Sequence, residues 1–145
     1  MQLVEQGKLA LDDSAQLEAL PPELRDVKVL QSDGSGGVKL VAKERRLTLR
    51  MLLNHTSGFG YAFEDPKLLG WSRPIEPDDF SSNVHDVLHR PLLKQPGTNL
   101  KYGVGLDRVG RLVGRLTGLS LETYFQTFIL RPLEIQRITF FRRKI

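Results

Sequence analysis

Two chain-breaking signals in the C-terminal half enclose the clearest predicted element of this sequence. Pro96-Gly97 favours a type II turn, and Gly118 ends the regular run that follows it. Between them, apolar residues recur at the spacing of one helix face, with arginines between them: Leu106, Val109, Val113 and Leu116 on the apolar side, and Arg108, Arg111 and Arg115 on the other. The pattern predicts an amphipathic helix from about Val104, with its apolar face turned inward and its arginines solvated.

Shorter signals place other elements around this helix. The apolar runs Val27–Leu30 and Val38–Ala42 flank the Gly-rich linker QSDGSGG, which predicts a small hairpin. Helix N-caps are expected at Asp12 or Asp13, at Thr48 and at Ser120, the last opening a helix to Leu130; the segment 61–83 is expected to be mostly a loop, and residues 138–141 are strand-like. The residues alone therefore predict a mainly α chain with one hairpin.

Composition excludes several classes of chemistry. The 145 residues include no cysteine, so disulfides, thiolate catalysis and cysteine metal ligands are ruled out. The net charge of +4 is not interleaved with aromatic residues, and we predict no nucleic-acid partner. No apolar run approaches a membrane span, and the N-terminus lacks a signal-peptide pattern. We expect a soluble, cytoplasmic protein that needs no cofactor.

The histidine pair His85 and His89 has the spacing of one helix face. A zinc site of the H-E-x-x-H type would need a glutamate after the first histidine, and Asp86 stands there instead. We therefore predict no metal site and expect both histidines to be structural or solvated.

Three blocks in a fixed order resemble the serine β-lactamase-related family. They are GKLALDD (residues 7–13), RLTLRMLLNHTSGFG (46–60) and QPGTNLKYGVGLDRVGRLVGRLTGLSLETYFQTFILRPLEI (95–135). The variant YGVGLD is most similar to the fungal, lovastatin-type transesterase branch. The resemblance implies an α/β fold of which this chain holds the helical subdomain, with most of the sheet missing. Residues 1–145 would then form one partial β-lactamase-related domain.

The resemblance also implies a catalytic tyrosine. In this family the nucleophile is the serine of a Ser-x-x-Lys motif, and the lysine and a tyrosine shuttle its proton; that tyrosine corresponds to Tyr102. Many members carry asparagine two residues later, where this chain has Val104. None of the chain's serines has a lysine three positions on. Trp71 is a candidate for the mouth of a substrate pocket, although a packing role is the favoured interpretation.

These features leave three hypotheses for function. The first is a truncated pseudoenzyme related to acyltransferases and esterases of fungal secondary metabolism, whose ancestral substrate would be a small acyl ester or thioester. The second is a non-catalytic interaction module, in which a protein partner covers exposed apolar helix faces. The third is an incomplete gene model of an active enzyme, with the Ser-x-x-Lys motif encoded upstream.

Overall fold

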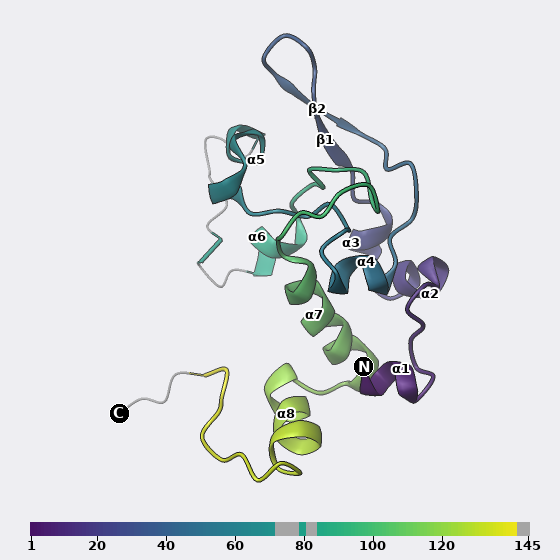
Figure 1. The fold of residues 1–145 in the computed structure, drawn as a ribbon, viewed down its shortest axis with the longest axis vertical. Coiled ribbons are helices and arrows are strands. Elements are labelled where there is room, and N and C mark those ends of the chain that lie inside the picture. The colour runs from purple at the N-terminus through teal and green to yellow at the C-terminus, as the bar shows by residue number, and fades with distance from the viewer. Residues whose placement is uncertain (72–78, 81–83, 142–145) are drawn as a thin grey trace. The chain divides into compact units, whose positions relative to one another are not determined.

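The computed structural model describes residues 1–71, 79–80 and 84–141, and it divides into two compact units, residues 1–109 and 110–145. The described elements, in chain order, are α1 (Gln2–Glu5), α2 (Ser14–Ala19), α3 (Pro22–Arg25), β1 (Val29–Ser32), β2 (Val38–Val41), α4 (Leu49–Leu53), the 3₁₀ helix η1 (Ala62–Glu64), α5 (Pro66–Trp71), α6 (Val84–Leu88), α7 (Gly105–Thr117), α8 (Leu121–Phe125) and the π-helical turn η2 (Gln126–Leu130) (Figure 1). The described part of the chain is therefore mainly α with one hairpin, as the sequence predicts.

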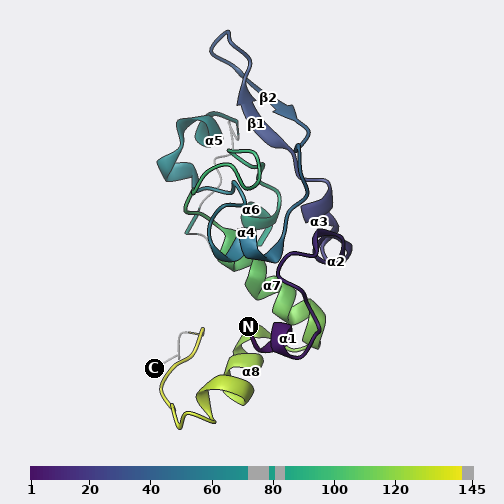
Figure 2. The same ribbon diagram turned by 45° about the vertical axis from the view of Figure 1, so that its right-hand side comes forward.

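The predicted hairpin is confirmed. Strands β1 and β2 pair antiparallel with Val29 opposite Val41 and Ser32 opposite Val38. The Asp33 carboxylate accepts the backbone N–H groups of Ser35 (2.9 Å) and Gly37 (3.0 Å), which closes the turn and lowers the pKa of that carboxyl. The turn points away from the helices of the first unit (Figures 1 and 2).

Local capping signals correctly located three helix starts. The Asp13, Thr48 and Ser120 side chains accept the backbone N–H of Gln16, Met51 and Thr123, respectively. Each cap satisfies a donor that has no partner within the first turn of its helix. Because donor and acceptor lie three residues apart, these starts depend on nothing distant in the chain.

The core of the first unit is built from leucines contributed by α2, α3, α4, α5 and the segment before the Pro96-Gly97 turn. Leu17, Leu47, Leu52, Leu68 and Leu92 have no exposed surface. Leu92 also adds to the sheet edge: its N–H donates to the Lys28 carbonyl (2.8 Å), and its own carbonyl accepts from Leu30 (2.7 Å). This exchange ties the chain just before the turn to β1.

The predicted orientation of α7 is wrong at two positions. Leu106 is 49% exposed, whereas Arg108 is only 2% exposed. The Arg108 guanidinium lies 3.9 Å from the centre of the Phe59 ring and donates to the carbonyls of Val87 (2.7 Å) and Leu88 (3.1 Å). Burial lowers the pKa of Arg108 to about 9. An aromatic face and two helix-end carbonyls therefore replace water as the surroundings of this cation.

Two other expectations need correction. The predicted loop 61–83 contains η1 and α5, which begins at Pro66, a residue suited to the first helical position; residues 72–78 and 81–83 lie outside the described part. The strand-like residues 138–141 are irregular because side chains of α8 and η2 take their backbone groups. Glu122 accepts the N–H of Phe140 (2.8 Å), and Gln126 donates to the carbonyl of Ile138 (2.8 Å).

Candidate active site around Tyr102

The loop that follows α4 is paired by backbone hydrogen bonds to the segment that carries Tyr102. The carbonyls of His55, Thr56 and Gly58 accept the N–H groups of Lys101 (2.8 Å), Gly97 (2.7 Å) and Leu93 (2.7 Å), in that order. Two stretches that are about forty residues apart in the sequence therefore run side by side. This pairing places Tyr102 next to residues 55–58, which we call the HTSG loop.

Glycines allow the two stretches to approach closely. A Cβ atom on Gly103 would lie 2.5 Å from both the Gly60 Cα and the Phe59 carbonyl oxygen. Gly58 has a φ of +92°, and a Cβ there would collide with the Lys94 carbonyl. Only glycine fits these backbone contacts without displacement. The glycine that follows Tyr102 therefore fixes the distance between the tyrosine and the loop.

Aromatic rings surround Tyr102 on its loop side, while its side chain stays accessible. The ring centres of His55 and Tyr61 lie 4.5 Å and 5.7 Å from that of Tyr102, and Tyr102 is 56% exposed. His55 adopts a φ of +59°, which is uncommon for a residue with a side chain. Its buried Nδ1 atom has no hydrogen-bond partner among the described residues. Tyr102 is therefore in contact with two rings and still has an accessible side chain.

The row of rings continues outward from Tyr61. Its ring stacks on Phe63 at 5.2 Å, and Phe63 stacks on Phe80 at 5.5 Å. Burial, reinforced by the negative charge of Asp107, raises the pKa of Tyr61, so this phenol stays neutral at neutral pH. Phe63 and Phe80 are 59% and 80% exposed. The surface beside Tyr102 is therefore apolar and aromatic.

A buried ion pair fixes the start of this aromatic row. The Arg90 and Asp79 side chains are 1% and 3% exposed and meet at 2.5 Å. The other carboxylate oxygen of Asp79 accepts the N–H groups of Ala62 (2.7 Å) and Phe63 (3.3 Å). Arg90 also donates to the Gly60 carbonyl (3.1 Å). The pair thus links Gly60 to η1 and fixes the position of Asp79, which immediately precedes Phe80.

Sequence reasoning named Tyr102 but missed the residues that support it. Arg90, Asp79 and Tyr61 carry no motif, and only the run of aromatic residues after HTSGFG hints at a ring cluster. The other candidate, Trp71, ends α5 and packs against a separate cluster formed by Leu30, Ala62, Leu68 and Leu93. Its half-buried position matches the packing interpretation.

Ser57 lies in the loop that pairs with the Tyr102 segment, but it is not placed to act as a nucleophile. Ser57 is 1% exposed, and its backbone N–H donates to the Met51 carbonyl at 3.0 Å. A nucleophile needs both access to the substrate and a base within hydrogen-bond reach. Ser57 therefore fits the loop-stabilising interpretation.

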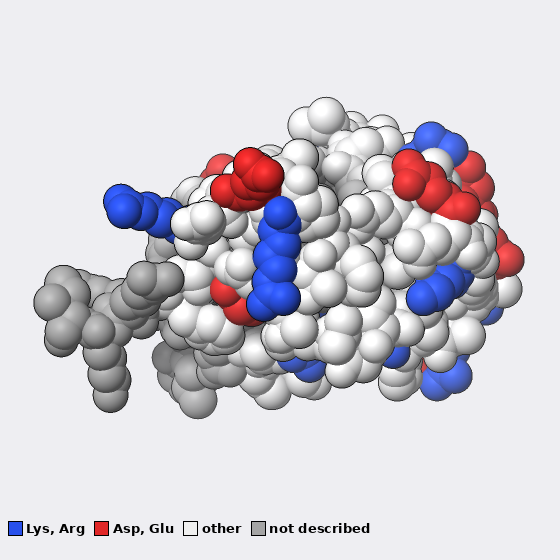
Figure 3. Space-filling model, turned by 90° about the horizontal axis from the view of Figure 1, so that it is seen from below, with Lys and Arg blue, Asp and Glu red and all other residues white. Residues whose placement is uncertain are grey.

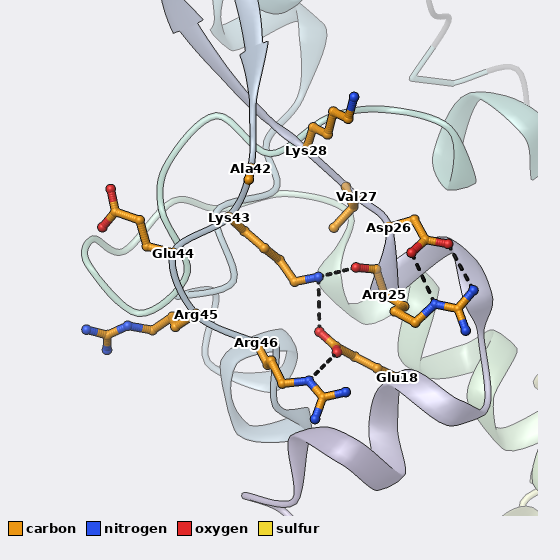
Figure 4. Close-up of a pocket in the computed structure, with 10 residues that line it drawn as sticks. All are labelled: Glu18, Arg25, Asp26, Val27, Lys28, Ala42, Lys43, Glu44, Arg45 and Arg46. Carbon is orange, nitrogen blue, oxygen red and sulfur yellow. Dashed lines mark hydrogen bonds and ion pairs between the residues drawn. The ribbon is translucent and has the colours of Figure 1, made fainter.

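A hollow of about 400 Å³ lies elsewhere in the first unit, between α2, α3 and the segment after β2 (Figure 4). Its centre is the Glu18 carboxylate, which pairs with Lys43 (3.1 Å) and Arg46 (2.7 Å) and accepts the Leu47 N–H (3.2 Å). Lys43 also donates to the carbonyls of Leu24 (3.2 Å) and Arg25. All three N–H donors of the Lys43 ammonium are used, so this cluster joins α2 and α3 to the segment after β2.

The described residues contain no group of three or more metal-ligating side chains. In the same part of the chain, no helix is long and apolar enough to cross a membrane. On the face shown in Figure 3, blue and red side chains are interspersed among uncharged ones. That face carries no continuous field of one sign.

Comparison with known proteins identifies the family. The family model described as Beta-lactamase matches residues 1–144. The chain therefore belongs to the β-lactamase family, as its three sequence blocks imply.

Relatives within this family include enzymes of acyl transfer and ester hydrolysis. Monacolin J acid methylbutanoyltransferase of Aspergillus terreus is 36% identical over 142 residues, which are 97% of this chain and 34% of that protein. Lovastatin esterase of Penicillium rubens is 38% identical over 144 residues, 97% of this chain and 36% of that protein. The chain thus spans about a third of the length of the curated relatives it matches.

Solved structures support the same assignment. Unliganded simvastatin synthase (LovD) from Aspergillus terreus superimposes with a TM-score of 0.83 and 36% identity, covering 96% of this chain and 34% of that one. The helices and hairpin described above therefore correspond to a part of a β-lactamase-family enzyme fold.

Proposed function

We propose that this chain carries the tyrosine half of an acyl-transfer site and that the 145 residues alone do not turn over substrate. The observation that supports the proposal is an accessible Tyr102, fixed by backbone pairing and ring contacts, in a sequence without any Ser-x-x-Lys motif. Residues 1–145 would then form one partial β-lactamase-related domain and act as a pseudoenzyme.

The energetics of catalysis support inactivity of the isolated chain. Removing the nucleophile of a serine hydrolase costs on the order of 10⁶ in rate, which corresponds to about 8 kcal/mol of barrier. General acid–base catalysis by a positioned side chain contributes about 10²–10⁴. Tyr102 acting without a nucleophile therefore falls short by at least about two orders of magnitude.

An activated ester tests this proposal directly. We expect the purified chain to give no burst with p-nitrophenyl butyrate, and no acyl adduct in its intact mass. Tyr102→Phe is the matched control, and it should hydrolyse the ester at the same background rate as the native chain. A stoichiometric burst, or an acylated side chain located by peptide mapping, would refute inactivity.

A chimera tests the role of Tyr102 separately. The aligned part of this chain, 97% of its length, would replace the matching 34% of the Aspergillus terreus methylbutanoyltransferase, which supplies the rest of the fold. In a folded, active chimera, Tyr102→Phe should lower kcat by about 10²–10⁴ with a smaller effect on KM. Tyr61→Phe serves as the control and should retain most activity. Equal activity of the chimera and its Tyr102→Phe variant would refute the proton-shuttle role.

The substrate class follows from the relatives and from the surface beside Tyr102. The relatives are named for methylbutanoyl transfer to monacolin J acid and for lovastatin ester cleavage. The exposed rings of Phe63 and Phe80 suit an apolar group near the reacting carbonyl. A small acyl ester or thioester of fungal secondary metabolism is thus the substrate class we propose for the complete site.

A second candidate function is an interaction module. The second unit exposes several large apolar side chains, with 45–66% of their surface accessible: Phe128, Leu133, Ile138, Phe140 and Phe141. Exposed apolar groups at this density mark contact surfaces. Light scattering and the binding of a hydrophobic dye test the idea. A chain that is monomeric by light scattering and binds no dye would argue against it.

The third candidate is an active enzyme made from a longer polypeptide of which these residues are a part. The site around Tyr102 would then receive its serine and lysine from the additional segment. Sequencing the transcript upstream of the Met1 codon discriminates this candidate: an in-frame Ser-x-x-Lys motif supports it, and an in-frame stop codon without the motif refutes it.

A further inference from the structure

Two features of His55 destabilise the folded chain. Its φ is +59°, in the left-handed region that residues with a side chain seldom occupy. Its Nδ1 atom is buried and has no hydrogen-bond partner among the described residues, and a buried polar atom without a partner costs free energy. Strained backbone and unpaired polar atoms persist mainly at functional sites. Both features therefore point to a role of the His55 side chain beyond shaping the HTSG loop.

The loop needs a residue that tolerates positive φ at this position, but it does not need an imidazole. Asparagine and glycine both adopt the left-handed conformation, and neither would bury a ring nitrogen. His55 accepts the Lys101 N–H (2.8 Å) through its backbone carbonyl, which any residue type offers. The pairing of the loop with the Tyr102 segment is therefore independent of the side chain at position 55.

The ring of His55 makes a contact that asparagine or glycine would lose. It lies against the ring of Tyr102, with centres 4.5 Å apart and planes inclined by 46°. The second ring beside Tyr102, that of Tyr61, is farther away at 5.7 Å. Tyr102 is 56% exposed, and a side chain with so much free surface keeps its rotamer freedom unless neighbours restrict it. The His55 ring is the nearer of its two aromatic neighbours.

We propose that His55 is a positioning residue for Tyr102: its ring holds the phenol in one rotamer and so sets the place of the hydroxyl. The inference rests on the proton-shuttle role proposed above. It also explains the residue type. The position requires an aromatic ring and positive φ together, and histidine is the aromatic residue that is enriched in the left-handed region. The unpartnered Nδ1 is then the energetic cost of meeting both requirements with one side chain.

Two variants of the 145-residue chain separate the ring from the backbone conformation. His55→Asn suits positive φ and removes the ring, whereas His55→Phe keeps a ring and strains the backbone. Three-bond Hα–Hβ couplings of Tyr102 measure its χ1 rotamers. We expect one dominant rotamer in the native chain, averaging in His55→Asn, and native-like couplings in His55→Phe, although His55→Phe should unfold at lower urea concentration. Tyr124, which packs on Phe128 in the second unit, is the control.

A loop-shaping role alone predicts the opposite result for His55→Asn. The variant should then fold, as judged by circular dichroism, and leave the Tyr102 couplings unchanged. That outcome would overturn the positioning role. His55→Asn decides the question by itself if His55→Phe does not fold.

The chimera with the methylbutanoyltransferase distinguishes this inference from the proposed function. A displacement of about 1 Å can cost about 10² in rate, so His55→Asn should lower kcat by about 10–10²-fold with a smaller effect on KM. In a Tyr102→Phe background, the same substitution should change kcat by less than about twofold, because no hydroxyl is left to position. Equal effects of His55→Asn in both backgrounds would overturn the positioning role alone. No effect of Tyr102→Phe would refute the shuttle, and the Tyr102 couplings would still decide whether His55 holds the ring.

Discussion

The buried pair Arg90–Asp79 offers the sharpest test of how the candidate site is held. Asp79→Asn keeps the shape of the side chain and removes its charge. Both native side chains are at most 3% exposed, so solvent screens little of the loss. Leaving one member of a buried pair uncompensated costs about 3–5 kcal/mol. We expect the lower end, about 3 kcal/mol, because the amide oxygen can still accept an N–H from Ala62 or Phe63.

Urea unfolding followed by circular dichroism measures this loss. For a chain of this size, about 3 kcal/mol corresponds to a fall in Tm of about 6–12 °C. The double variant Asp79→Asn/Arg90→Met removes the uncompensated cation as well. Its loss of unfolding free energy should be smaller than the sum of the losses in Asp79→Asn and Arg90→Met by at least about 1 kcal/mol, because the two residues share one interaction.

The same variants separate stability from site geometry. Asp79 bonds the backbone of η1, so its loss should loosen the stacking of Phe63 on Phe80 before the unit unfolds. Hydrogen exchange at the Ala62 and Phe63 amides should accelerate in Asp79→Asn under native conditions. A free energy of unfolding within about 0.5 kcal/mol of the native value, with unchanged exchange at both amides, would refute this role of the Arg90–Asp79 pair.

Three further changes test other parts of the fold. Gly58→Ala should destabilise the chain by about 1–3 kcal/mol in urea unfolding, since it imposes positive φ and a collision with the Lys94 carbonyl. Gly7→Ala also imposes positive φ (+68°) but meets no atom, so it should cost less and isolates the effect of the collision. Ser120→Ala should cost about 1 kcal/mol by removing the cap of α8, and Ser120→Asp should restore it. Hydrogen bonding to the Phe140 N–H lowers the pKa of Glu122, so this contact is present above the ordinary carboxyl value of 4.5 and is lost as the pH falls through the lowered pKa. The protection factor of the Phe140 amide should therefore fall in acid, and a pH-independent protection factor would contradict the contact.

Local features of this fold were predictable because their partners are close in the sequence. The Thr48 side chain reaches Met51, and Asp33 closes its turn on Ser35 and Gly37. Such contacts are encoded within a few residues, so propensity and spacing suffice. The irregular residues 138–141 mark the limit of that reasoning. Their β-branched and aromatic residues favour a strand, but Glu122 and Gln126 use their backbone groups instead.

Features set by distant partners were not predictable. Arg108 looked like a solvated residue because helical periodicity assigns every arginine to the polar face. Its actual surroundings, Phe59 and the end of α6, lie at least twenty residues away. The Arg90–Asp79 pair was missed for the same reason. Tyr102 itself was predicted through family resemblance alone, and its neighbour His55 is brought to it by loop pairing that no local signal encodes.

The support of Tyr102 is separable from the proton-shuttle role that we propose for it. Its backbone is fixed by the carbonyl of His55, which holds Lys101, and by the close approach of Gly103 to Gly60. Neither contact involves the serine or the lysine of a Ser-x-x-Lys motif. The contacts that hold Tyr102 in place are therefore independent of a Ser-x-x-Lys pair. An ordered Tyr102 is therefore no argument for activity, and the chimera, whose remaining two thirds come from the methylbutanoyltransferase, is the experiment that tests whether the tyrosine moves a proton.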